Sequence, residues 1–200
     1  MKKLISAIAV FFACLTLSAC ARNTDDCVFT NLELVNPGLS DRYLMDNLEM
    51  LEDWSNIAVV GKFVGDTVQD IEYQYDAYFE KDIVTGVMSE NTIEVSRVLM
   101  GDINVGDELR IVQRYAVVDG QLITFSDLTP MQKGDEWVFF LRKVLNTDKY
   151  ICSADYQSRF PVSGAENALM PLSDSSELGV YEKSHFDKAI YDEIVEKYGI

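Results

Sequence analysis

The side chains best suited to covalent or metal chemistry are few: four cysteines and a single histidine, His185. A Ser-His-Asp or Cys-His catalytic centre would have to be built around His185, and the chain has no nucleophile-elbow sequence. Transition-metal sites usually need several His and Cys ligands, and glycine-rich phosphate loops are absent from the sequence. We therefore predict a protein that is not an enzyme, with no catalytic residue, no metal and no cofactor.

The thiol with the clearest chemical context is Cys20, at the end of an amino-terminal export-type segment. Two lysines precede an apolar stretch, residues 4–17, which is too short to be a comfortable membrane span. Two small residues then stand directly before Cys20. This pattern resembles the lipobox of bacterial lipoproteins, which implies lipid transfer to the Cys20 sulfur, cleavage before Cys20 and acylation of the new amino terminus. The alternatives are an ordinary secretory signal with an incidental cysteine, or an uncleaved amino-terminal span.

The resemblance to a lipoprotein implies a domain organisation and a location. Residues 1–19 form a signal peptide, residues 20–39 a lipidated tether, and residues 40–200 a single domain with its own core. More than one acyl chain gives stable anchoring, so we expect the domain to be held at a cell membrane on its extracytoplasmic face. The membrane is thus the first expected partner.

The charge of the chain argues against nucleic acid as a partner. Loss of residues 1–19 removes two lysines and no acid, which leaves 15 basic and 33 acidic residues and a formal charge of -18. A field of this sign repels phosphate backbones and anionic lipid head groups. We therefore predict no nucleic-acid binding and a domain that stands off the membrane surface.

Two cysteines remain after processing besides the lipidated one, namely Cys27 and Cys152. Outside the cytoplasm they could form a disulfide that closes a loop of more than a hundred residues, and chain entropy makes such a bond worth about 4 to 5 kcal/mol. Two separate buried thiols are the alternative, and the sequence leaves both readings open.

Hydrophobic periodicity predicts a mainly β fold of the α+β class, with a helix at each end. The first helix runs from an N-cap at Ser40 to about Trp54. The last is capped by Ser184, with Asp187 in a capping-box-like position, and ends at Gly199. The strands between them are expected at residues 57–64, 92–99, 108–112, 122–125, 137–142 and 150–154, with an edge strand at 160–162. Several short strands between turn signals fit a small β-barrel.

Three blocks of sequence make the barrel more specific: WSNIAVVGK at residues 54–62, TIEVSRVLMGD at 92–102 and GDEWVFFL at 134–141. They resemble the netrin-like OB-fold domains of the tissue-inhibitor-of-metalloproteinases type, and they are also similar to uncharacterised lipoproteins of Gram-positive bacteria. The resemblance implies an OB-like barrel. Inhibitors of that family bind protease zinc through a free amino-terminal cysteine, and an acylated Cys20 cannot do this. We therefore expect the family's fold without its activity.

An aromatic and acidic segment, residues 66–91, separates the first two strands of the predicted barrel. It contains Tyr73, Tyr75, Tyr78 and Phe79, and in an OB-fold the loop at this place binds ligands. The alternative is that Tyr73 and Tyr75 extend a strand as alternating core residues.

These observations predict a membrane-anchored, non-enzymatic interaction or ligand-binding module whose partner is a protein or a small molecule. An inhibitor or regulator of an extracellular enzyme, acting through the segment from Tyr73 to Phe79, is the second interpretation. A hydrolase with paired carboxylates is the third, although the spacing of the 33 acids singles out no pair.

Overall fold

The computed structural model is mainly β, and it describes residues 33–35, 45–118, 120–124, 130–162 and 187–200. Its elements are β1 (Glu33–Val35), α2 (Leu48–Asp53), β2 (Ile57–Asp76), β3 (Lys81–Met100), β4 (Glu108–Gln113), β5 (Tyr115–Val118), β6 (Gln121–Thr124), β7 (Glu136–Lys143), β8 (Lys149–Cys152), the 3-10 helix η2 (Asp155–Ser158), β9 (Arg159–Pro161) and α3 (Lys188–Tyr198). β1 lies within the segment predicted as a tether, so three residues of that segment belong to a sheet.

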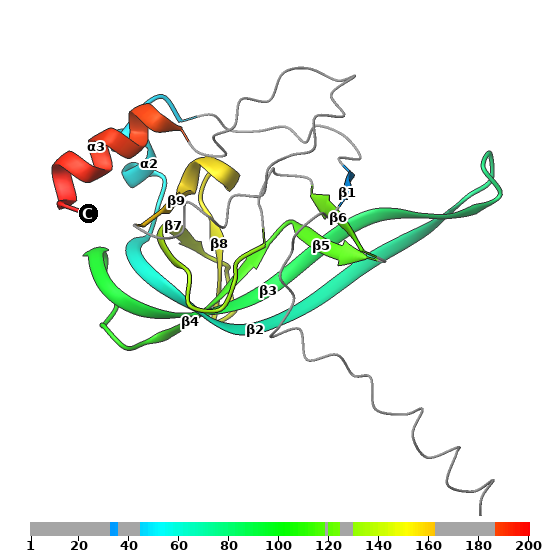
Figure 1. Cartoon of the computed structure of the whole chain (residues 1–200), viewed down its shortest axis with the longest axis horizontal. Helices are drawn as coiled ribbons and strands as arrows, with labels where there is room; N and C mark the ends of the chain where they lie inside the picture. Colours follow the sequence, from blue (N-terminus) through cyan, green and yellow to red (C-terminus); the bar gives the residue numbers. More distant parts are fainter. Residues whose placement is uncertain (1–32, 36–44, 119, 125–129, 163–186) are drawn as a thin grey trace, which may run out of the picture.

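The strands form two sheets of unequal size. The larger has the order β2-β3-β4-β8-β7-β9, and β7 also pairs with β2. All of its pairings are antiparallel except β4 with β8. The smaller has the order β1-β6-β5 and lies beside the long β2–β3 hairpin (Figure 1). Helices α2 and α3 lie together at the other end of the molecule (Figure 1).

The start of β2, from Ile57 to Gly61, is buried on both faces, which explains its uninterrupted apolar run. Ile57, Val59 and Phe63 point into one apolar cluster with alternate residues of β7, while Ala58 and Val60 point into a second cluster. The second cluster also contains the helix residues Leu48, Leu51, Ile190 and Ile194. The two helices therefore cover the face of the large sheet opposite the first cluster.

Both predicted helices are present, but each begins later than the sequence suggested. Helix α2 starts at Leu48 with the Asn47 side chain as its N-cap, so the predicted start after Ser40 is wrong. Helix α3 starts at Lys188 with Asp187 as its N-cap, rather than in a capping box begun at Ser184. Ser40 and Ser184 themselves lie outside the described residues. The predicted end of the last helix at Gly199 is confirmed, and Gly199 adopts the left-handed conformation there, with φ 63°.

The predicted strands are present, and the largest difference is their length. β2 and β3 each have 20 residues and continue through most of the segment expected as a loop, with a turn at residues 77–80. A tight connection, residues 101–107, joins β3 to β4. Gly101 and Gly106 there have φ near +90°, a conformation that glycine adopts without strain.

Candidate functional site

The outer half of the β2–β3 hairpin, residues 68–88, is here called the arm, and its turn projects away from the other labelled strands and helices (Figure 1). Here the described parts of β2 and β3 pair only with one another, because β7 pairs with β2 at residues 57–62 and β4 pairs with β3 at 89–94. The arm holds most of the large exposed apolar side chains: Val68, Tyr73, Tyr75, Tyr78, Phe79 and Met88. It is the candidate interaction surface.

One face of the arm is covered near its base and bare near its tip. Ile71, Val84 and Val87 pack with Ala116 and Ile123 of the small sheet. Strand alternation places Tyr73 and Tyr75 on this same face, farther out, where they are 57% and 62% exposed. The interpretation in which Tyr73 and Tyr75 extend a strand is confirmed, but their expected burial in the core is wrong, as is the alternative of a loop at their positions.

The base of the arm is attached to the small sheet through polar side chains. The Gln69 amide accepts a hydrogen bond from the Val117 backbone N–H at 2.6 Å and donates one to the Val117 carbonyl at 3.3 Å. The Ser89 hydroxyl donates to the Tyr115 carbonyl at 2.7 Å. These bonds occupy backbone groups of β5 as a neighbouring strand would, so the proximal arm is held in place.

The tip of the arm has a defined conformation. Asp76 Oδ1 accepts hydrogen bonds from the backbone N–H groups of Tyr78, at 2.8 Å, and Phe79, at 3.1 Å. The rings of Tyr78 and Phe79 meet edge to face with centroids 5.0 Å apart, and Lys81 Nζ lies 5.8 Å from the Phe79 ring centre. The exposed aromatic side chains are therefore presented on a structured turn.

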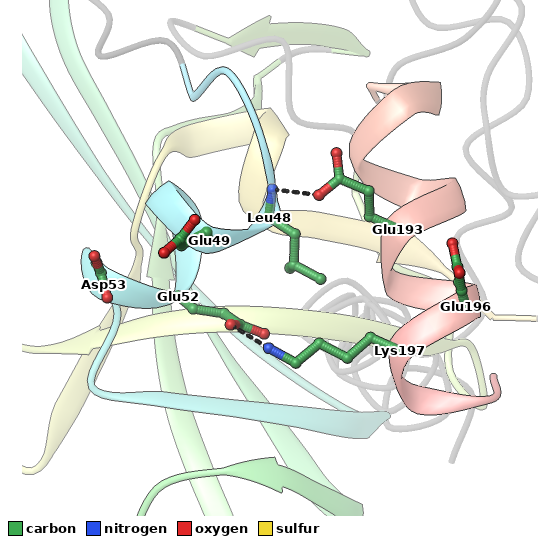
Figure 2. Close-up of a pocket in the computed structure, with 7 residues that line it drawn as sticks. All are labelled: Leu48, Glu49, Glu52, Asp53, Glu193, Glu196 and Lys197. Atoms are coloured by element: carbon green, nitrogen blue, oxygen red, sulfur yellow. Dashed lines mark hydrogen bonds and ion pairs between the residues drawn. The ribbon is translucent and has the colours of Figure 1, made fainter.

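A second feature is an acidic hollow of about 760 Å³ between α2 and α3, whose lining residues Figure 2 shows. It is lined by five carboxylates, with Leu48 and Lys197 as the other residues: Glu49, Glu52, Asp53, Glu193 and Glu196. Glu193 Oε2 accepts a hydrogen bond from the Leu48 N–H at 3.0 Å, and Glu52 pairs with Lys197 and with the Tyr198 hydroxyl. Burial and the Glu52 carboxylate both raise the pKa of Tyr198, so this phenol stays protonated. These bonds join the two helices.

The carboxylates of the hollow show no metal-binding arrangement. The described residues contain no group of three or more His, Cys, Asp or Glu side chains placed to hold a metal ion. Two of the five carboxylates are already engaged between the helices. We therefore interpret the hollow as the seam of helix packing.

A chain of hydrogen-bonded polar side chains leads from the half-buried Thr67, at the base of the arm, through buried residues to Cys152. Thr67 Oγ1 and the Tyr115 hydroxyl donate to Asn91 Oδ1 at 2.8 and 3.1 Å, and Asn91 Nδ2 donates to Gln113 Oε1 at 3.1 Å. Gln113 Nε2 then lies 3.7 Å from Cys152 Sγ, in hydrogen-bond contact. Burial raises the pKa of Tyr115, so its hydroxyl remains a donor. These hydrogen bonds pair the polar side chains that lie inside the body at the point where the β2–β3 hairpin leaves it.

Several predicted site residues lie outside the described part of the chain. Cys20 and Cys27 are among them, so lipidation and the Cys27–Cys152 pairing stay predictions. The single histidine, His185, for which no catalytic role is expected, also lies outside the described residues. Cys152 itself is 8% exposed and belongs to the first apolar cluster.

Comparison with known proteins adds no assignment: no family model, no curated protein and no solved structure matches the chain. None of the helices in the described ranges has the length and apolarity required to cross a bilayer.

Sequence reasoning missed the polar chain, although a signal for it exists. The strand period puts Ser89 and Asn91 on the same face of β3 as Ile93 and Val95, and Gln113 on the same face of β4 as Ile111. Polar residues at core-facing positions of two paired strands indicate a buried hydrogen-bond network.

Proposed function

We propose that the chain is a lipid-anchored, non-enzymatic binding module on the extracytoplasmic side of a membrane, and that the arm contacts a protein partner. The observation that carries this proposal is the exposure of four aromatic side chains at the outer arm. Tyr73, Tyr75 and Phe79 are 57–62% exposed, and Tyr78 is 87% exposed. Aromatic residues are enriched at protein interfaces, where burying their large surfaces contributes most of the binding energy.

The strand pairings support an OB-like barrel as the scaffold of this module. The order β2-β3-β4-β8-β7, with β7 pairing again with β2, is a ring of five strands. OB-folds are small five-stranded barrels that bind ligands through the connection between their first two strands and the adjacent sheet face. In this chain that connection is the arm.

The structured tip also supports a binding role. The bonds from Asp76 to the Tyr78 and Phe79 amides hold the turn in one conformation before any partner arrives. A surface that is ordered beforehand loses less conformational entropy on binding.

Site-specific photocrosslinking tests the arm. When benzoylphenylalanine replaces Tyr78, photocrosslinking in the cells that make the protein should give one discrete adduct with a partner protein. The same group at Leu145, which is equally exposed at 87% on the β7–β8 turn, should not. Phe79 and Val105, at 62% and 66%, form a second matched pair.

The adduct should also disappear when Tyr73 and Tyr75 are both replaced by serine in a folded protein. If the Tyr78 and Leu145 positions give the same adducts, the arm is not the contact surface.

The anchor is tested by metabolic labelling with a radioactive fatty acid. Cys20→Ser should lose both the label and the association with the membrane fraction, while Cys27→Ser should keep both. A labelled Cys20→Ser protein would show that the anchor assignment is wrong.

A second candidate function, inhibition of an extracellular enzyme, is favoured by the shape of the arm. The two strands of the arm extend well beyond the body (Figure 1), and the turn that joins them, residues 77–80, includes the exposed Tyr78 and Phe79. This form suits insertion into a cleft. The crosslinked partner distinguishes the two functions. If it is an enzyme, the purified chain should inhibit it, and Tyr78→Ser with Phe79→Ser should abolish the inhibition.

A further inference from the structure

The arm has an outer strand edge on each side. Between residues 68 and 76, β2 pairs with β3 on one side, and no described strand pairs with its other side. The same holds for β3 between residues 81 and 88, because β4 begins to pair only at Ser89. An uncovered strand edge presents backbone N–H and C=O groups that can pair with an added strand.

The two edges differ in charge. The β2 side, residues 68–76, carries Asp70, Glu72 and Asp76 and no basic residue. On the β3 side, residues 81–88, Lys81 offsets Asp82. The β2 edge is therefore the one that attracts a cationic segment.

The side chains of the β2 edge are also sorted by face. Strand alternation puts Asp70, Glu72 and Asp76 on one face and Ile71, Tyr73 and Tyr75 on the other. In the β2–β3 register, Asp70 stands opposite Met88 and Glu72 opposite Gly86, neither of which is charged. No ion pair formed among the described residues involves Asp70 or Glu72. Their charges are available to a partner.

We propose, building on the proposed function of the arm, that the outer edge of β2 binds an extended peptide segment in which basic and apolar residues alternate. The segment would pair with the β2 backbone at residues 68–76. Its Lys or Arg side chains would lie beside Asp70 and Glu72, and its apolar side chains beside Tyr73 and Tyr75. The period of two in a strand matches the alternation of the two faces.

A second copy of the arm is a poor occupant of this edge. Each arm carries five acidic residues and one lysine, so pairing two arms would bring like charges together. Charge complementarity thus favours a cationic partner over self-association.

The probe is an acetylated, amidated peptide of four Lys-Val repeats, titrated against the full chain in zwitterionic detergent by fluorescence anisotropy. The double variant Asp70→Asn with Glu72→Gln should bind it about tenfold more weakly, since two exposed charge pairs are lost. The double variant Glu94→Gln with Asp102→Asn removes two exposed acids away from the arm and should bind within about twofold of the wild type. Equal weakening by both pairs would reduce the binding to general attraction by an acidic protein and overturn the proposal.

Backbone pairing is tested separately from charge. A peptide with N-methyl groups on alternate amides keeps every charge but loses its pairing edge, so it should bind at least about tenfold more weakly. The unmodified peptide should slow amide hydrogen exchange in residues 68–76 and leave 81–88 unchanged. Equal affinity of the two peptides, or protection of 81–88 in place of 68–76, would overturn the proposal.

The two proposals can fail independently. If Tyr78 forms no adduct in cells but the peptide protects residues 68–76, the edge binds as proposed and the tip is not the contact surface. If Tyr78 forms its adduct and the Asp70→Asn, Glu72→Gln variant binds the peptide like the wild type, the edge proposal alone is wrong.

Discussion

The two halves of the β2–β3 hairpin are continuous in hydrogen bonding and opposite in environment. In the inner half, β2 from Ile57 to Phe63 is buried except at Lys62, with β7 paired along its other edge. In the outer half, the arm, the only buried residue is Val87. Pairing alone therefore does not distinguish a core strand from an exposed one. The two halves differ in what packs on each face. The inner half therefore stabilises the fold, whereas the side chains of the outer half remain exposed for contact with a partner.

The same contrast holds for charge. Glu90, at the point where β4 begins to pair with β3, forms ion pairs with Arg110 and Lys149. Within the described chain, Asp70 and Glu72 of the arm form none. Carboxylates of the body thus contribute to its packing, whereas those of the arm remain exposed to solvent and to partners.

The largest effect is expected from one substitution made in both halves of β3. Ile93 is fully buried, so Ile93→Ala should lower the free energy of unfolding by about 2 to 5 kcal/mol through lost burial and a residual cavity. Ile83 lies ten residues earlier in the arm and is only half-buried, so Ile83→Ala should cost about 1 kcal/mol or less. Urea unfolding measures both values. Equal losses would show that the arm is as integral to the core as the inner half.

The inner half of the hairpin could be predicted from the sequence, because burial on both faces makes its residues apolar at nearly every position. The runs at residues 57–63 and 136–141 are apolar at nearly every position, since alternate residues fill two different clusters. A dense apolar run between turn residues predicts such a strand. The spacing of Ile190 and Ile194, four residues apart and both buried in α3, is likewise typical of a helix.

The arm could not be predicted in the same way, because its alternating sequence fits both a ligand-binding loop and a strand with core-facing tyrosines. Tyr73 and Tyr75 alternate with Glu72, Gln74 and Asp76 as a half-buried strand would, yet within the described structure both tyrosines are exposed. Whether an aromatic residue is in the core depends on the position of β5 and β6, which is a tertiary property. The segment expected as a loop is a strand, and the tyrosines expected in the core are exposed. Only the aromatic composition pointed to the surface that we propose as the site.

The next largest difference is expected when a glycine is replaced by alanine in the inner half of the hairpin and in the arm. A Cβ at Gly61 would lie 2.3 Å from Ile93 Cδ1, in a packed core, so Gly61→Ala should destabilise by about 1 to 3 kcal/mol. A Cβ at Gly86 would meet the Glu72 carboxylate at 2.8 Å, and that exposed side chain can swing into solvent. Gly86→Ala should therefore be neutral or slightly stabilising. Thermal unfolding compares the two, and a large loss at Gly86 would mean that the arm is packed like the body.

Shortening the arm removes surface with little expected change in stability. Gln74 and Ile83 are register partners, so residues 75–82 can be replaced by Asn-Gly as a two-residue hairpin turn. The free energy of unfolding should change by less than about 1 kcal/mol, because no buried residue is lost. Urea unfolding of the shortened and full-length chains measures this change. A shortened chain that fails to fold would show that the outer arm is needed by the body.

The smallest effect concerns one paired carboxylate of the body and one acid of the arm. The hydrogen bond and charge of Arg110 hold the pKa of Asp148 below its ordinary value of 3.8. The stability that this pair contributes is therefore fully present above pH 3.8 and is lost as the pH falls through the lower, folded-state pKa. Asp148→Asn should be slightly less stable than the wild type at neutral pH, with the difference in stability closing in strong acid.

Asp70→Asn should show no such loss at neutral pH. It removes repulsion with Glu72 on the same face, and it breaks no ion pair within the described residues. The urea unfolding midpoints of the wild type, Asp148→Asn and Asp70→Asn are compared from neutral pH to strong acid. A loss of stability in Asp70→Asn that matches the loss in Asp148→Asn would mean that the acids of the arm already have cationic neighbours in the free protein.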